Sequence, residues 1–460
     1  MLFVSLIAAA ILTLIYVLLN RKRQRPTLPY PPGPTVTNMP ADDAWVEYRN
    51  WGKAYGKLVY IQDRNILILN DSRVAIDLLG KRARIYSDRK MTPMMKLSPY
   101  SDNWRRKRKL FQQNFRQSTI NRFHSHQENR VHEFLRNLIT TPDKFMQHIM
   151  ALSQRIMSSS LWGLDVHPED PFAQNVAKSV LAMGQAFLPG AFPAIERFPW
   201  LRFMPSWFPG CEFARVAEQC LRTVKETNDI PFDRAMDNLK TGKGTSLVAE
   251  LASRCEGDLA EIEAIKAMGT TSYLGMQITA SSIGSFTLTI VLHPDVQAKA
   301  QEEIDRVVGR DRLPTFEDRL SLPYIEAIYR ELMRLHPPVP LGIEHSSIED
   351  DSYLGYHIPK DPDVYSRPDD FLPERFLDSS GPFTSLKVCI GRYMADNTVW
   401  LTIASVLATL NLRKPKDKHG NDIAILEDYT SGFFRHPKPF QCSITPRTPY
   451  AEKLIVATAS

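Results

Sequence analysis

The segment "SSGPFTSLKVCIGRYMADNTVW" (379–400) decides how the chain is interpreted, because it joins a cysteine to the start of an apolar helix. Gly391 lies two residues after Cys389. A mostly apolar stretch, "ADNTVWLTIASVLATL" (395–410), follows it. Upstream of Lys387 the segment is mostly small and polar. These residues alone leave two interpretations open: Cys389 is a metal ligand in an altered loop, or it is an ordinary buried cysteine.

The composition is that of a globular protein, with 43% hydrophobic and 23% charged residues in a chain of 460. Five cysteines without a Cys-x-x-Cys pair argue against a disulfide framework and against a structural zinc site. The net charge of +6 is spread along the chain. It fits a membrane surface or an acidic protein partner better than nucleic acid, so we expect no nucleic-acid partner.

The N-terminus predicts a membrane anchor. Residues 2–19 carry no charge and would reach about 27 Å as a helix, close to the thickness of a bilayer core. The basic run "RKRQR" (21–25) follows directly, which by the positive-inside rule keeps the body cytosolic. A cleaved signal peptide is the alternative, but its basic residues would precede the apolar run. We expect a transmembrane anchor over 1–20 and a basic, proline-rich linker over 21–35.

The remainder, residues 36–460, is predicted to be one mainly helical body with small β regions near both ends. Residues 57–70 predict two short strands around a turn, and residues 439–447 a further strand. Helices are expected over 102–160, 261–292, 294–309 and 324–338. The central one lacks charge from 267 to 292, but its threonines, serines and glutamine make a poor lipid-facing surface. We expect it to be buried rather than to span a membrane.

An acid and a base are paired on the helix that contains "YRELMRLHPP". Glu331 and Arg334 are three residues apart, so they share a helical face. Taken alone, they predict a surface ion pair that contributes less than about 1 kcal/mol. The helix is apolar, however, and "PERF" (373–376) follows it with a second arginine, Arg375.

In this order the motifs resemble the cytochrome P450 family. The features that carry the resemblance are the anchor, "PPGP", "WRRKR", the central helix, Glu-x-x-Arg, "PERF", the cysteine loop and the C-terminal tail "TSGFFRHPKPFQCSITPR". The resemblance covers nearly the whole chain. It is strongest to fungal, membrane-anchored members of secondary metabolism, of the O-methylsterigmatocystin oxidoreductase type. It implies a mainly α fold with small β regions (α+β), built as a triangular helical body around haem b.

The resemblance also implies roles for single residues. Cys389 would be the axial thiolate ligand of the iron, which favours cleavage of the O–O bond. Gly391 would let the loop turn into the following helix. Three residues would form the buried charge triad that supports the loop: Glu331, Arg334 and Arg375. Three others would contact the haem propionates: Trp104, Arg108 and His345.

The implied activity is that of a haem-thiolate monooxygenase. It would insert one oxygen atom from O2 into a hydrophobic small molecule, with electrons from an NADPH–cytochrome P450 reductase. The implied location is the endoplasmic reticulum membrane, with a single span and the body on the cytosolic side. The basic residues after Trp104 could bind the acidic reductase.

Two parts of the pattern depart from the family. Upstream of Cys389 the family has Phe-Gly-x-Gly-Arg, whereas residues 382–386 read "PFTSL" and lack both glycines and the arginine. In the central helix the acid and threonine of the oxygen-activating pattern are replaced by Gln277 and Ile278. Thr279 lies one residue further on, about 100° around the helix. Gln277 and Thr279 remain the candidate catalytic residues, and oxygen activation is expected to be less efficient.

Several segments also look shortened relative to the family, among them the junction of Lys360 with Asp361 and the stretch before Cys389. Gaps at motif edges suggest missed exons or a splice isoform. Two alternatives to an active monooxygenase therefore stay open. One is a haem protein of the same fold that has lost efficient oxygen activation, and the other is a membrane-anchored remnant that cannot hold haem.

Overall fold

The computed structural model describes residues 28–36, 39–40, 43–88, 102–167, 169–186, 192, 194–195, 198–255, 257–359, 363–365 and 391–459. They group into two compact units. The smaller unit contains the described residues of Met1–Thr37, Tyr48–Lys90 and Glu344–Ser366, and the larger unit contains the rest. The predicted anchor lies outside the described residues.

The smaller unit contains a three-stranded sheet of order β1-β2-β5 and a separate β3-β4 pair. Its elements are most of α2 (Ala44–Tyr55), β1 (Leu58–Ile61), β2 (Ile66–Leu69), α3 (Ser72–Ala75), a π-helical turn (Ile76–Lys81), α4 (Ala83–Tyr86), β3 (Asp351–Tyr353), β4 (Tyr356–Ile358) and β5 (Asp363–Tyr365). β1 and β2 are antiparallel around a short 3-10 turn, Gln62–Arg64, which confirms the predicted hairpin. β5 pairs in parallel with β2.

The proline-rich stretch of the predicted linker packs on β1. The Tyr60 amide donates to the carbonyl of Pro32 at 3.0 Å, and the ring of Tyr30 stacks on that of Tyr60 with centroids 5.3 Å apart. A Cβ on Gly33 would lie 2.1 Å from the Tyr60 carbonyl oxygen, so only glycine permits this approach.

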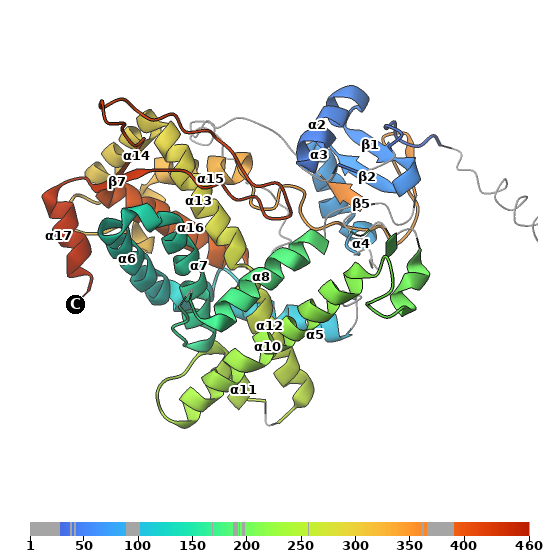
Figure 1. Ribbon diagram of the computed structural model, residues 1–460, viewed down its shortest axis with the longest axis horizontal. Helices are drawn as coiled ribbons and strands as arrows, with labels where there is room; N and C mark the ends of the chain where they lie inside the picture. The colour runs from blue at the N-terminus through green and yellow to red at the C-terminus, as the bar shows by residue number, and fades with distance from the viewer. Residues whose placement is uncertain are drawn as a thin grey trace, which may run out of the picture. The chain divides into compact units, whose positions relative to one another are not determined.

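The larger unit is helical apart from one β pair (Figure 1). Its helices are α5 (Asp102–Phe115), α6 (His124–Thr140), α7 (Phe145–Trp162), α8 (Pro171–Ala186), α10 (Glu212–Lys240), α11 (Leu247–Ser253), α12 (Leu259–Leu274), α13 (Met276–Leu292), α14 (Pro294–Val307), α15 (Pro323–Leu335), α16 (Arg392–Thr409) and α17 (Pro449–Ala457). The strands are β6 (Leu410–Arg413) and β7 (Ser443–Pro446). Four 3-10 turns complete it: Ile120–Phe123, Pro142–Lys144, Pro199–Phe203 and η6 (Phe316–Ser321). The predicted helices of 102–160, 294–309 and 324–338 are confirmed.

The central helix differs from its prediction in one respect, because it is interrupted at Gly275. The amide of Gly275 bonds the carbonyl of Ser272, and the amide of Ile278 bonds the carbonyl of Gly275. The backbone hydrogen bonds here therefore join residues three apart, as in a 3-10 helix, instead of four apart. A helix over Leu259–Leu292 is long and apolar enough to cross a membrane, but its most apolar window is 83% buried inside the protein. The prediction of a buried helix is confirmed.

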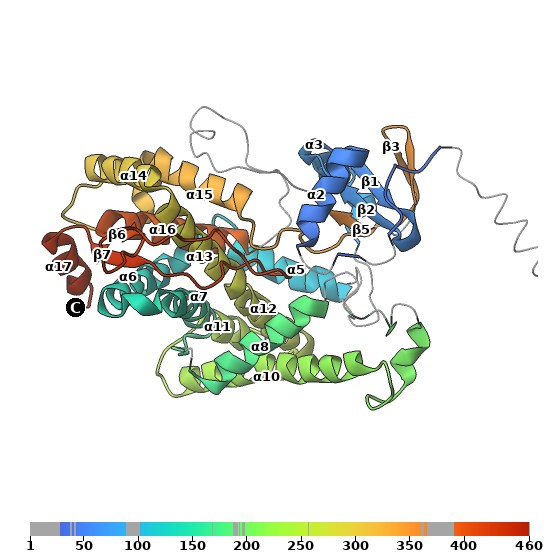
Figure 2. The same ribbon diagram turned by 45° about the horizontal axis from the view of Figure 1, so that its top comes forward.

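α16 lies at the centre of the larger unit. It packs against α6, α13, α14 and α15 (Figures 1 and 2), and its residues Trp400, Ile403, Ala404 and Leu407 are fully buried. The sequence explains this position, since the helix is apolar on all sides beyond its second turn. The segment that follows Cys389 is thus a core helix.

α14 aligns its neighbours through buried polar side chains. The carboxylate of Glu303 accepts the amides of Tyr324 and Ile325 at 2.9 to 3.1 Å, which caps the N-terminus of α15. The amide of Gln297 pairs with the backbone of Leu412 in both directions at 2.9 Å, which closes the edge of β6.

The predicted acid–base pair on α15 is present and buried. Arg334 donates from Nε and Nη2 to the two carboxylate oxygens of Glu331 at 2.7 and 2.8 Å. The Glu331 side chain is fully buried and that of Arg334 is 16% exposed. The interpretation as a weak surface pair therefore fails, because this carboxylate has lost its contact with water and depends on its partners.

Arg334→Ala should lower the free energy of unfolding by about 3–5 kcal/mol, because it leaves a buried carboxylate without the guanidinium that lies against it. The matched control is Arg330→Ala on the same helix. Arg330 pairs with Glu326 and is 31% exposed, so its loss should cost less than about 1 kcal/mol. Urea unfolding followed by circular dichroism compares the two; equal losses would contradict this account of α15.

Candidate functional site

The candidate site is built around the segment that contains Cys389, and the structure describes this segment from Gly391 onward. Cys389, Arg375 and the altered loop at 382–386 lie outside the described residues. The structure therefore shows the helix that follows Cys389 and the helices that surround it. The third member of the predicted charge triad is not placed.

The N-terminus of α16 suits a thiolate ligand. The helix starts at Arg392, three residues after Cys389, with Gly391 at its N-cap position. Its N-terminal amides and its dipole favour a negative charge placed just ahead of them, as a thiolate would be. Gly391 has an ordinary helical φ of −75°, and a Cβ on it would meet no heavy atom of a described residue within 4 Å.

The four other cysteines do not provide a ligand of this kind. Burial raises the pKa of Cys220, that of Cys255 and, to about 12, that of Cys442, so these three stay neutral thiols. Cys211 is buried in a small apolar cluster, where its thiol donates to the carbonyl of Leu201. None of these four thiols is therefore in surroundings that favour a thiolate, and Cys389 stays the predicted ligand.

Gln277 and Ile278, the two residues of the central helix that differ from the family pattern, lie in the first turn of α13. Gln277 is 3% exposed and Thr279 is 7% exposed, so both predicted catalytic side chains are enclosed by protein. Ile278, which takes the family's threonine position, is half-buried and has the more open side chain. The Ser282 hydroxyl, one turn on, bonds the carbonyl of Ile278 and contacts the sulfur of Met333 on α15. Position 278 therefore carries a half-buried apolar side chain where the family has a hydroxyl.

The residues predicted to contact the propionates are divided between the two units, and each is described within its own unit. Trp104 and Arg108 lie on α5 one helical turn apart, and Arg108 is half-buried. In the smaller unit, the His345 Nδ1 lies 2.8 Å from the carbonyl oxygen of Tyr86. Because a carbonyl can only accept, Nδ1 carries the proton, and His345 could also donate from Nε2 only as the charged imidazolium.

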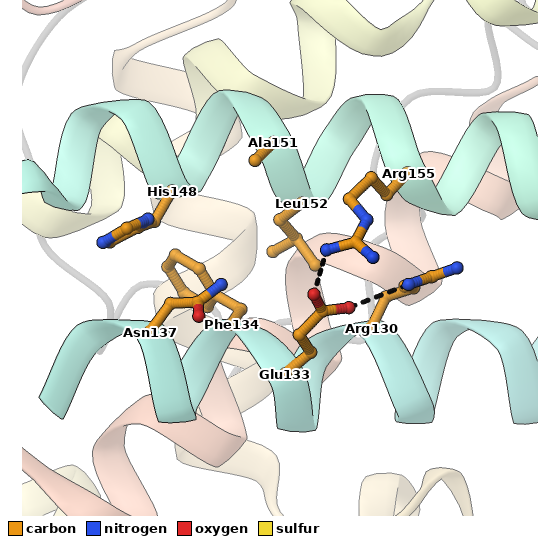
Figure 3. A pocket seen from close by; sticks show the side chains of 8 residues that line it. All are labelled: Arg130, Glu133, Phe134, Asn137, His148, Ala151, Leu152 and Arg155. Carbon is orange, nitrogen blue, oxygen red and sulfur yellow. Dashed lines mark hydrogen bonds and ion pairs between the residues drawn. The ribbon is translucent and has the colours of Figure 1, made fainter. Parts of the chain in front are cut away.

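A surface hollow between α6 and α7 is a weaker candidate (Figure 3). Its charges neutralise one another: Glu133 pairs with Arg130 at 2.8 Å and with Arg155, and Arg155 also pairs with Asp165 at 2.6 Å. Little unpaired charge is available for a ligand, so this cluster joins two helices rather than forming a binding site.

The residues present fit a haem held through Cys389. A cysteine precedes the N-terminus of a core helix, and α13 carries the half-buried, apolar side chain of Ile278 just after the helix break at Gly275. One cluster on α16 was not predicted from the sequence. Arg319 binds Asp396 at 2.6 Å although the two residues are 77 positions apart, and no local pattern signals such a pair.

Comparison with known proteins agrees with this arrangement. The family model "Cytochrome P450" matches residues 29–444. Cytochrome P450 monooxygenase COX1 of Coprinopsis cinerea is 33% identical over 94% of this chain and 94% of its own length. Tryptamine 4-monooxygenase of Psilocybe cyanescens is 32% identical over 97% of this chain and 98% of its own length. Among solved structures, a zebra fish cytochrome P450 with abiraterone superposes with a TM-score of 0.68 at 20% identity, covering 89% of this chain and all of that one.

The alignments also indicate missing segments. The alignment with COX1 runs over 488 positions, although this chain has only 460 residues and does not fill all of them. The relative therefore contains residues that this chain lacks, as the shortened motif edges suggest.

The match to the family model over most of the chain, the relatives over nine-tenths of it and the shared fold have one explanation: the chain belongs to the cytochrome P450 monooxygenase family, whose members hold a haem iron through a cysteine thiolate.

Proposed function

We propose that this chain is a membrane-anchored monooxygenase that oxidises a hydrophobic small molecule, with Cys389 as the haem ligand. The observation that carries the proposal is α16, a core helix whose N-terminus lies three residues after Cys389. Haem ligated by thiolate supplies activation of dioxygen when it is bound. The chain's own part is to hold the thiolate charged at the helix N-terminus and to exclude water with the apolar residues around α13.

The reduced, carbon-monoxide difference spectrum of the full-length protein in membranes tests the ligand. Wild type should give the red-shifted Soret band of a thiolate-bound haem, and Cys389→Ser should abolish that band. The control is Cys220→Ser, which removes a half-buried thiol on α10 and should leave the band unchanged. A red-shifted band that persists in Cys389→Ser would show that another residue is the ligand.

A second candidate function is a P450-fold protein impaired in oxygen activation, and Ile278 supports it. A hydroxyl or carboxyl near bound oxygen normally relays protons, and the open position on α13 carries neither. Gln277 cannot act as a carboxylic acid does, and it is enclosed along with Thr279. Under this candidate, electrons are consumed but little product forms.

Ile278→Thr should raise the product formed per NADPH consumed by about tenfold, because it returns a hydroxyl to the open side of α13. Thr287→Val is the control, since it removes a buried hydroxyl more than two turns further along α13, and it should alter this ratio less than about twofold. The measurement is turnover with reductase on a panel of apolar metabolites. Indoles belong in the panel because one relative is named for tryptamine. A larger loss with Thr279→Val than gain with Ile278→Thr would make Thr279 the proton relay.

The reductase and the membrane are proposed as partners on separate grounds. Arg105, Arg106 and Lys109 of α5 are exposed and could bind an acidic reductase surface. Besides the uncharged N-terminal segment, an aromatic patch supports contact with lipid. We define it by Phe198, Trp200, Phe203 and Trp207, which are 50%, 51%, 72% and 79% exposed.

The chemistry of the aromatic patch suits the bilayer interface. Residues 198–210 contain no acidic residue, and the guanidinium of Arg202 lies over the Phe203 ring at 4.7 Å. Tryptophan beside a cationic side chain is typical of segments at the level of lipid head groups. Exposed aromatics this close together would otherwise favour aggregation. We therefore propose the cytosolic face of the endoplasmic reticulum membrane as the location.

Quenching of tryptophan fluorescence by lipids brominated in their acyl chains tests the aromatic patch in the full-length protein. Trp200→Phe/Trp207→Phe should reduce the quenching by about half or more, because these rings would be the ones that reach the acyl chains. The control, Trp162→Phe/Trp400→Phe, removes two core indoles and should leave the quenching unchanged. Equal quenching in the patch variant and wild type, or self-association through the aromatic patch, would contradict a lipid contact.

A further inference from the structure

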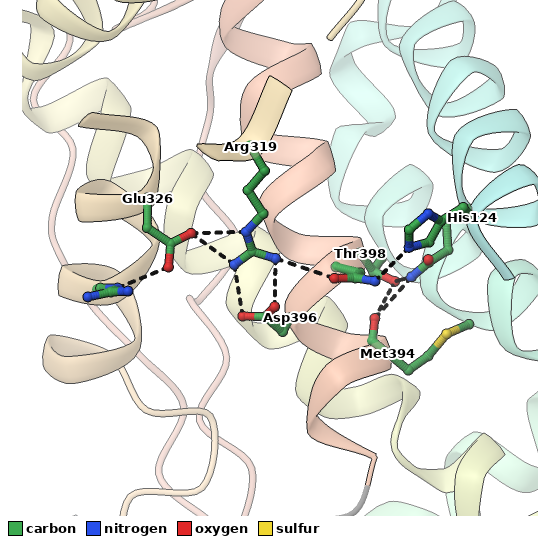
Figure 4. Close-up of polar contacts among 9 residues, drawn as sticks. His124, Arg319, Glu326, Met394, Asp396 and Thr398 are labelled. Carbon is green, nitrogen blue, oxygen red and sulfur yellow. Dashed lines mark hydrogen bonds and ion pairs between the residues drawn. The ribbon is translucent and has the colours of Figure 1, made fainter. Parts of the chain in front are cut away.

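The second turn of α16 carries a charge cluster centred on Arg319 of η6 (Figure 4). Its guanidinium bonds both carboxylate oxygens of Asp396, Nη1 at 2.6 Å and Nη2 at 3.1 Å, and Nη1 reaches the Asn397 amide oxygen at 3.3 Å. Its other edge binds Glu326 of α15 at 2.9 and 3.1 Å. One side chain thus links three elements of the fold.

The environment of Arg319 holds it in one orientation. The side chain is 20% exposed, and its guanidinium lies over the rings of Trp400 at 5.3 Å and Tyr329 at 5.8 Å. Its carboxylate partners are also mostly covered, with Asp396 27% and Glu326 23% exposed. A planar guanidinium can satisfy two carboxylates and stack on aromatic rings at the same time, which a lysine ammonium cannot do.

α6 holds the same two turns of α16. The Gln127 amide is fully buried and donates to the Met394 carbonyl at 3.0 Å and to the Thr398 hydroxyl at 2.7 Å. The His124 Nε2 lies 3.1 Å from the Asn397 amide nitrogen. Side chains of α6 and of η6 therefore both bind residues 394–398 (Figure 4).

These contacts hold the helix close to its start. Among the described residues, the amides of Met394 and Ala395 bond the carbonyl of Gly391 at 3.2 and 3.3 Å. The first turn of a helix frays readily, and fraying here would move the backbone that leads to Cys389. The upstream loop also lacks the glycines of the family pattern. The orientation of the proposed thiolate then depends on how firmly the side chains of α6 and η6 hold residues 392–399.

We propose that Arg319 is a positioning residue for the haem thiolate. Through Asp396 and Asn397 it fixes the first two turns of α16, the helix that begins three residues after Cys389. This role is separate from that of the Glu331–Arg334 pair, which lies within α15 and makes no described contact with Asp396. The inference rests on the proposed role of Cys389.

Two readouts test this role in the full-length protein. Hydrogen exchange of peptides over 392–399 reports how firmly the helix start is held, and it requires no haem. The reduced, carbon-monoxide difference spectrum reports thiolate ligation. In Arg319→Ala, exchange over 392–399 should rise about tenfold or more, while exchange over 400–409 changes less than about twofold. The red-shifted band should give way to the shorter-wavelength band of a haem without a thiolate.

Two further variants sharpen the test. Arg319→Lys keeps the positive charge but loses the planar guanidinium that binds two carboxylates at once. The rise in hydrogen exchange and the loss of the red-shifted band should therefore both be intermediate. Arg312→Ala is the matched control. Arg312 binds Asp318 in the same bidentate way, at 2.6 and 2.7 Å, but its partner lies in η6 rather than on α16. It should alter neither readout.

The proposal is overturned if exchange over 392–399 in Arg319→Ala equals that of wild type, or if the whole of α16 exchanges faster to the same extent, since that is general destabilisation. Equal effects of Arg312→Ala would overturn it as well. A wild type without the red-shifted band would contradict the role of Cys389 and, with it, positioning of a thiolate. The exchange result would still show whether Arg319 holds the helix start.

Discussion

The packing of α16 is the constraint on which the rest of the site depends. Cys389 lies three residues before this helix in the sequence, so the proposed ligand depends on how the helix start is held. α16 is buried against α6, α13, α14 and α15, and polar side chains from α6 and η6 bind its second turn. The buried Glu331–Arg334 pair and the Glu303 cap in turn fix α15. In the proposed function, support for the thiolate therefore comes from residues downstream of the cysteine, where the sequence keeps the family pattern.

The start of α13 differs from the family pattern in its chemistry. Residue 278, just after the helix break at Gly275, is a half-buried isoleucine where the family has a threonine. An apolar side chain at this position cannot transfer a proton, so this change bears on oxygen activation and not on the packing of α16.

Local patterns predicted the elements well, and long-range contacts were beyond them. Two apolar runs around a polar turn predicted the β1–β2 hairpin, an N-terminal proline marked the start of α14, and two prolines after the helix marked the end of α15. The spacing of Glu331 and Arg334 gave their pairing but not their burial, which depends on neighbouring helices. Gly275 sits in an apolar helix and gave no local reason for a break. The Arg319–Asp396 pair joins residues 77 positions apart, and only the fold brings them together.

The most direct test of the account is the haem content of purified full-length protein. Because the described helices retain the packing that places Cys389, we predict about one haem per chain despite the altered loop upstream. A protein with the expected helical circular dichroism but no bound haem would contradict the central claim. It would show that the loop glycines are indispensable, and that an intact α16 cannot by itself hold the ligand.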